Sequence, residues 1–121
     1  MKASLDDVKM GHGLDGTTTL GPLINKRSAD KAKELVQDAL DKGAKLLVDN
    51  QDVADACFVN PTVVIDATPD MRFFKEEIFG PVAPIYRFSD EADVIKMAND
   101  TDYGLAGYLY YQRPWSCLPR V

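Results

Sequence analysis

Two adjacent carboxylates, Glu76 and Glu77, lie between aromatic residues in the stretch FFKEEIFGPVAPIYRF, residues 73–88. Paired carboxylates can act as general acid and base, but neighbours on a regular strand point to opposite faces. We therefore do not expect an acid and base pair across one substrate. One of the two could instead accept hydrogen bonds from a polyol, such as a ribose diol, held between Phe74 and Phe79. On composition alone, an exposed pair of charges on a loop is the favoured interpretation.

The other reactive side chains are isolated in the sequence. His12 lies in the stretch GHGLDG and, apart from the nearby Asp15, has no Cys, Asp or Glu at metal-ligand spacing, so we expect a loop residue. GHGLDG does not follow a strand and open a helix, as a dinucleotide-binding glycine loop must. Cys57 and Cys117 lack a neighbouring His or helix start that would activate a thiol. We interpret both as free thiols, and expect no catalytic residue and no metal site.

Composition excludes several classes of protein. The 121 residues are 45% hydrophobic and 27% charged, which is typical of one soluble globular domain. Fourteen basic and nineteen acidic residues give a formal net charge of −5, and no cluster of Lys and Arg provides a surface for nucleic acid. No apolar run is long enough to cross a membrane, and the N-terminal residues do not resemble a signal peptide. We expect a cytoplasmic protein with neither nucleic-acid nor membrane partners.

Local patterns predict the elements that would position Glu76 and Glu77. Residues 10–25 are rich in Gly and Thr and predict an irregular loop. Apolar residues at helical spacing predict a helix over residues 26–42, which Asn25 caps and Gly43 ends. Two strands are expected next, at residues 44–48 and at the β-branched run 62–66, which we expect to be buried on both faces.

The second half of the chain reads as a strand, a helix and a strand. Residues 71–80 fit neither a helix nor a strand, and a strand is expected at residues 82–88. Ser89, followed by acidic residues, predicts a helix start. The apolar face of this helix is expected to comprise Ala92, Ile95 and Ala98. A last strand at residues 105–111 would complete a βαβ unit, which predicts an α/β fold with a largely parallel sheet flanked by helices.

Six blocks in order resemble the catalytic-domain region of aldehyde dehydrogenases. They are GHGLD, GPLIN, DALDKGAKLL, FVNPTVVID, KEEIFGPVAPIYRF and ANDTDYGLAGYLYY. The resemblance covers about residues 5–112, and EEIFGP is its most specific motif. The variants of the later blocks are most similar to the NAD(P)-dependent succinate-semialdehyde dehydrogenases. The resemblance implies that residues 1–112 form a partial aldehyde dehydrogenase catalytic domain, whose parent enzyme oxidises a small aldehyde, such as succinate semialdehyde, to the acid.

The resemblance assigns roles within EEIFGP. In this family the second Glu, here Glu77, binds the ribose hydroxyls beside the nicotinamide of NAD or NADP, and the following aromatic, here Phe79, packs near the nicotinamide ring. An ionised carboxylate is a strong acceptor for a diol, and the corner at Gly80 and Pro81 would fix its approach. These residues position the cofactor and do not perform the chemistry.

The remaining machinery of the family does not match this sequence. The dinucleotide-binding domain, the Glu base and the Gly-Gln-X-Cys nucleophile motif precede the matched region, and neither Cys57 nor Cys117 stands in the nucleophile's context. We expect a fragment that neither turns over aldehydes nor binds cofactor alone. The alternative is a non-catalytic interaction module that pairs, through exposed sheet edges, with full-length subunits or with its own copies. A third, weaker alternative is an independent nucleotide-binding domain.

The last residues depart from the family pattern. Residues 113–121, RPWSCLPRV, place Pro114 and Pro119 where the family continues into an amphipathic helix. A shift of the reading frame by one base permits Asp-Leu-Gly-Arg-Val-Phe-Arg-Val in this place, which has the expected helical pattern. An alternative splice end would look similar. Sequencing the gene distinguishes these hypotheses.

Overall fold

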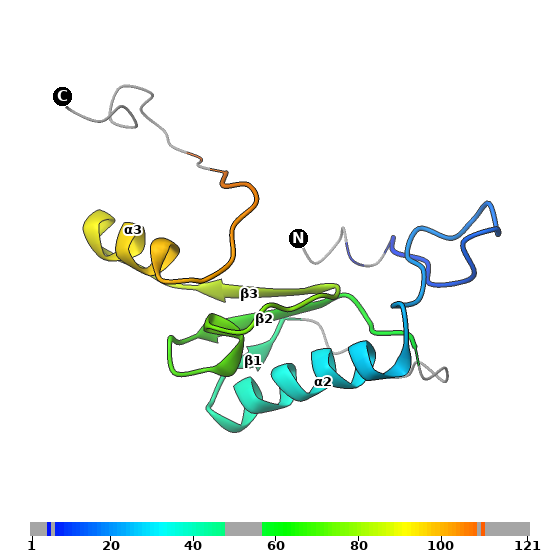
Figure 1. Ribbon diagram of the computed structural model, residues 1–121, viewed down its shortest axis with the longest axis horizontal. Helices are drawn as coiled ribbons and strands as arrows, with labels where there is room; N and C mark the ends of the chain where they lie inside the picture. The colour runs from blue at the N-terminus through cyan, green and yellow to red at the C-terminus, as the bar shows by residue number, and fades with distance from the viewer. Residues whose placement is uncertain (1–4, 6, 48–56, 109, 111–121) are drawn as a thin grey trace.

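A computed structural model of the chain describes residue 5, residues 7–47, residues 57–108 and residue 110 (Figure 1). The elements in order are α2 (Lys26–Asp41), β1 (Lys45–Leu46), β2 (Thr62–Ala67), the 3-10 helix η1 (Arg72–Phe74), β3 (Val82–Tyr86) and α3 (Glu91–Asn99). The sheet has the order β1-β2-β3, in which β1 is antiparallel and β3 parallel to β2. The predicted α/β class is confirmed, but the mostly parallel sheet is confirmed only in part, because one of its two pairings is antiparallel.

Helix α2 forms where the sequence predicted it. The side chain of Asn25 caps it by accepting a 2.9 Å hydrogen bond from the N–H of Ser28. Gly43, at a φ of 96°, follows the last turn in a conformation that favours glycine. Leu35 is fully buried and belongs to the same core cluster as Val64 of β2. The helix therefore covers one face of the sheet with the apolar stripe that its periodicity predicted (Figure 1).

Strand β2 contains a bulge. Val64 pairs with Pro84 and Ala67 with Tyr86, so β2 has one more residue than β3 between these pairs. Asp66 takes up the irregularity at a φ of 59°, a left-handed conformation that Asp tolerates better than most residues. Its side chain accepts hydrogen bonds from Arg87 and Lys45, which lower the pKa of the carboxyl. The predicted strand is present, although burial on both faces is incomplete because Ile65 is only partly buried.

Helix α3 begins close to the predicted start, but Asp90 and not Ser89 caps it, accepting hydrogen bonds from the N–H groups of the first turn at 2.9 and 3.1 Å. The predicted apolar face is wrong, since Ala92, Ile95 and Ala98 are all exposed and no residue of the helix is buried. Val94 and Met97 are the partly covered residues. The physical reason is that α3 lies beyond the end of β3, on the side of the sheet away from α2, with an open hollow between it and β3 (Figure 1).

The predicted strand at residues 105–111 is wrong over the residues that the structure describes. Residues 105–108 and 110 have no strand pairing, and Leu105, Tyr108 and Tyr110 are strongly exposed. A strand needs a neighbouring strand for its hydrogen bonds, and this segment leads away from β3 (Figure 1). The βαβ unit is therefore incomplete in the described part of the chain.

The remaining predicted segments are also visible. The stretch before α2 is irregular, as predicted, and its main feature is an isolated bridge between Met10 and Leu20. The strand predicted at residues 44–48 is shortened to Lys45–Leu46, with Leu47 still donating a 2.9 Å hydrogen bond to the carbonyl of Val63. Residue 48 and the tail at residues 113–121 lie outside the described residues. Within the described part, no helix has the length and apolarity to cross a membrane.

Candidate functional site

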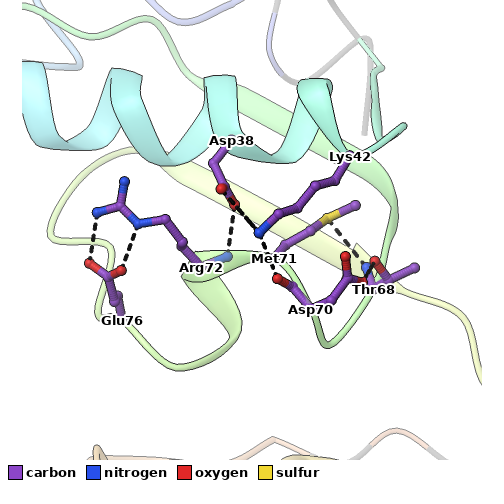
Figure 2. Close-up of polar contacts among 7 residues, drawn as sticks. All are labelled: Asp38, Lys42, Thr68, Asp70, Met71, Arg72 and Glu76. Atoms are coloured by element: carbon purple, nitrogen blue, oxygen red, sulfur yellow. Dashed lines mark hydrogen bonds and ion pairs between the residues drawn. The ribbon is translucent and has the colours of Figure 1, made fainter.

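The segment that leads to Glu77 runs antiparallel along α2 (Figure 2). Near the C-terminal end of the helix, the Nζ of Lys42 donates a 2.7 Å hydrogen bond to the carbonyl of Asp70. Further along, the backbone N–H of Arg72 donates to an Oδ of Asp38 at 2.9 Å. Asp38 also pairs with Lys42 at 3.1 Å. Polar contacts therefore fix the segment to α2 before it reaches the two glutamates.

Glu76 is held by two cations. The guanidinium of Arg72 contacts both carboxylate oxygens, with Nε to Oε1 at 2.8 Å and Nη2 to Oε2 at 3.2 Å. The ammonium of Lys31 on α2 pairs with the same carboxylate. These hydrogen bonds, that of Arg72 first and that of Lys31 second, lower the pKa of Glu76 to about 2. The carboxylate is charged at neutral pH and already engaged.

Burial alternates along residues 76–79. Ile78 is partly buried and packs against the core. Glu77 is exposed and, among the described residues, has no hydrogen bond or ion pair, while Phe79 is 81% exposed. Two anchored residues, Glu76 and Ile78, therefore alternate with two exposed ones, Glu77 and Phe79. The structure thereby separates the two glutamates that the sequence left equivalent.

Glu77 and Phe79 line an open hollow of about 200 Å³ against the first half of α2. The facing residues include Arg27, Ser28 and Lys31. The positive end of the helix dipole lies at this same end of α2. The hollow thus offers a carboxylate acceptor, an exposed aromatic ring and hydrogen-bond donors. Such a set can bind a polyol or a planar ring, and its described lining contains no cysteine.

The Gly80–Pro81 corner lies between α2 and β2. A Cβ on Gly80 would lie 3.4 Å from the Cβ of Ala32, which shows how closely the corner approaches the helix. The carbonyl of Pro81 accepts a 2.9 Å hydrogen bond from the N–H of Thr62, and Val82 donates to the carbonyl of Gly80 at 2.8 Å. The corner predicted from the sequence is therefore fixed on both sides.

Phe74 does not lie with Phe79. Its ring packs edge-on against Tyr86 at 5.5 Å between centroids and lines a different hollow, next to α3. The prediction that Phe74 and Phe79 flank one ligand is wrong, because the turn of η1 directs Phe74 toward β3. Sequence reasoning also missed the partners of Glu76. The spacing of four residues between Arg72 and Glu76 was the available signal for that pair.

The other candidates from the sequence do not form a site. His12 is exposed, and its Nδ1 accepts a 3.3 Å hydrogen bond from the N–H of Leu14. Asp15 accepts hydrogen bonds from the N–H and hydroxyl of Thr17, which lower the pKa of its carboxyl. Cys57 is partly buried, and its carbonyl accepts from Leu23, whereas Cys117 lies outside the described residues. No group of three or more potential metal ligands occurs in the described ranges.

Comparison with known proteins decides the family. Residues 1–115 match the pattern of the aldehyde dehydrogenase family. The chain belongs to the aldehyde dehydrogenase family. This agrees with the family resemblance of the EEIFGP region and with the fold that surrounds it.

Several members of the family are similar to this chain. The glutarate-semialdehyde dehydrogenase of Pseudomonas putida is 44% identical over 121 residues, which are 100% of this chain and 25% of that protein. The NADP(+) succinate-semialdehyde dehydrogenase of Escherichia coli is 41% identical over 122 residues, again 100% of this chain and 25% of the relative. The crystal structure of a succinate-semialdehyde dehydrogenase from Burkholderia pseudomallei superposes with a TM-score of 0.86 at 42% identity, covering 93% of this chain and 24% of that one. The chain thus spans about a quarter of the length of these relatives.

Proposed function

We propose that this chain forms the part of an aldehyde dehydrogenase catalytic domain that contacts the nicotinamide end of NAD or NADP. Glu77 binds the ribose hydroxyls, and Phe79 packs near the nicotinamide ring. The observation that carries the proposal is the contrast within EEIFGP, where Glu76 is engaged by two cations and Glu77 is displayed beside an exposed ring. A carboxylate without a protein partner is available to accept two hydrogen bonds from a diol.

The substrate class follows from the relatives. Glutarate semialdehyde and succinate semialdehyde, named for the two similar enzymes, are both small aldehydes that carry a carboxylate. We infer that the parent enzyme of this chain oxidises an aldehyde of that kind to the acid, with NAD or NADP as hydride acceptor. The protein's contribution at Glu77 and Phe79 is to orient the cofactor.

The 121-residue chain is expected to be inactive by itself. Its sequence contains no Gly-Gln-X-Cys motif, and no cysteine lies among the described residues that line the hollow beside Glu77. The hollow is open, so we also expect no measurable affinity of the isolated chain for NAD or NADP. Isothermal titration of the chain with each cofactor tests this. A measurable affinity that disappears in Glu77→Ala would instead favour an independent nucleotide-binding domain.

A transplant tests the role of Glu77. Residues 5–112 would replace the aligned part of the Escherichia coli relative, and the steady-state KM for NADP would be measured for the transplanted enzyme and its variants. A hydrogen bond to a charged group contributes about 1.5–3 kcal/mol, so we expect Glu77→Gln to raise this KM about ten- to a hundredfold. Glu91→Gln, an exposed carboxylate on α3, is the matched control and should leave it unchanged. An equal KM in both variants would contradict the proposal.

Exposed apolar side chains support a second candidate, an interaction module. Leu105 is fully exposed, Tyr110 is 92% exposed and Tyr108 84% exposed, which is unusual for a stable surface. We propose that such a module would pair with full-length aldehyde dehydrogenase subunits or with its own copies.

The outer edge of β3 is poorly suited to strand addition, so association would use side chains. Backbone N–H and C=O groups of successive strand residues point to opposite edges of the strand. The carbonyl of Pro81 points to β2, so the backbone groups of Val82 and Pro84 point to the outer edge. Pro84 has no N–H, and that of Val82 already donates to Gly80. Light scattering after mixing with the full-length relative tests association. A complex that forms with the wild-type chain and is lost in Leu105→Ser would support the interaction module. If the wild-type chain forms no complex, the interaction module is rejected.

A further inference from the structure

We propose that Glu76 is a positioning residue, which directs Glu77 and Phe79 toward the cofactor through its forked contact with Arg72 and its ion pair with Lys31. The inference rests on the proposed function of Glu77 and Phe79. It assigns a role to a carboxylate that does not itself touch the ligand.

The backbone of residues 77–79 has no hydrogen bonds of its own to the rest of the described chain. The Gly80–Pro81 corner holds its far end, so the direction of the backbone at Glu77 depends on that corner and on the side chains on either side of Glu77. Ile78 contributes an apolar contact with the core, which resists withdrawal but is not directional. Glu76 contributes the directional contact, because a guanidinium fork fixes the plane of a carboxylate.

Arg72 is itself held in place, so it can serve as a reference point. Its backbone N–H donates to Asp38 at 2.9 Å, and Asp38 pairs with Lys42 at 3.1 Å (Figure 2). These bonds also lower the pKa of Asp38, with the Arg72 N–H as the largest cause. The contacts connect Lys42 to Asp38, Arg72, Glu76 and finally Lys31. Lys31 in α2 and Lys42 at its C-cap are eleven residues apart, about 16 Å along the helix.

The network should matter for direction more than for stability. The side chains of Glu76 and Arg72 are 38% and 41% exposed, and ion pairs of that exposure contribute little to folding. A purely structural role would thus predict a small effect of Glu76→Gln everywhere in the molecule. A positioning role predicts a local loss of order at residues 77–79 with the rest unchanged.

Backbone relaxation of the ¹⁵N-labelled 121-residue chain distinguishes these outcomes. In the wild type we expect order parameters of about 0.85 for Glu77 and Phe79, although their amides have no hydrogen bond within the described residues. Glu76→Gln and Arg72→Met should each lower them toward about 0.6, with α2 and β2 unaffected. Glu91→Gln is the matched control, and near-UV circular dichroism checks that each variant keeps its tertiary packing.

The double variant and the transplanted enzyme complete the test. Because Glu76 and Arg72 act as one unit, combining Glu76→Gln with Arg72→Met should lower the order parameters no further than either change alone. Order parameters that stay at the wild-type value in Glu76→Gln, or that fall additively, would overturn the proposal. In the transplant, Glu76→Gln should raise the KM for NADP more than it lowers kcat. If Glu77→Gln leaves that KM unchanged while the order parameters still depend on Glu76, the proposed cofactor contact of Glu77 is rejected. The proposal that Glu76 positions residues 77–79 is then still supported.

Discussion

At the scale of single residues, the two glutamates of EEIFGP are the main finding. They are adjacent and chemically identical, yet Glu76 faces Arg72 and Lys31 while Glu77 is exposed without a protein partner in the described chain. The sequence could show that neighbours point to opposite sides. It could not show which side faces α2, because Lys31 lies 45 residues before Glu76 and this contact depends on the tertiary fold.

Tyr86 gives a prediction at the same scale. Its hydroxyl is buried and has no hydrogen-bond partner among the described residues, and burial raises the pKa of the phenol to about 12. An unsatisfied buried hydroxyl costs about 1–3 kcal/mol, so Tyr86→Phe should leave the unfolding free energy equal or increase it. Urea unfolding followed by circular dichroism measures this, with Tyr103→Phe at an exposed site as the control. A loss of stability in Tyr86→Phe would reveal a partner for the hydroxyl.

At the scale of elements, success and failure of the sequence predictions follow the range of the interactions. Helix α2 was predictable because its cap, its apolar spacing and its terminating Gly43 are all local. The shortened β1 and the absence of strand pairing at residues 105–108 and 110 were not, since a strand depends on a partner elsewhere in the chain. The face of α3 failed for the same reason: Ile95 has the right spacing, but no element of the described chain covers it.

The cap of α2 gives the prediction for an element. The side chain of Asn25 accepts a hydrogen bond from the N–H of Ser28, and the described structure offers this N–H no other acceptor. Asn25→Ala should therefore lower the unfolding free energy by about 1 kcal/mol. Asn25→Ser, which keeps a capping oxygen, should recover most of the loss. Thermal unfolding of the three proteins is the measurement. Equal midpoints for wild type and Asn25→Ala would mean that the cap is not formed.

At the scale of the whole molecule, the acidic groups predict a loss of stability in acid. Glu76, with a pKa of about 2, and Asp38 and Asp66, with lowered pKa values, bind protons more weakly in the folded than in the unfolded chain. Their stabilisation is present above the unfolded values, 4.5 for Glu and 3.8 for Asp, and is lost as the pH falls toward 2. Urea midpoints measured from pH 5 to pH 2 should therefore fall, and fall less steeply in Glu76→Gln. Midpoints independent of pH in this window would contradict the ion-pair network.

The difference between a closed core and an incomplete surface explains why the fold was easier to predict than its surfaces. The core around Leu35 and Val64 closes within the described chain, whereas Leu105 and Tyr110 remain uncovered. About a quarter of a family member therefore forms a core of its own but does not complete its surface.

The most direct test of the account is the crystal structure of the transplanted enzyme, carrying residues 5–112 of this chain, with NADP bound. We predict that the carboxylate of Glu77 lies within about 2.5–3.0 Å of the hydroxyls of the nicotinamide ribose, with Phe79 beside the ring and Glu76 still held by Arg72. A bound cofactor whose ribose contacts other residues, with Glu77 directed to solvent, would contradict the central claim.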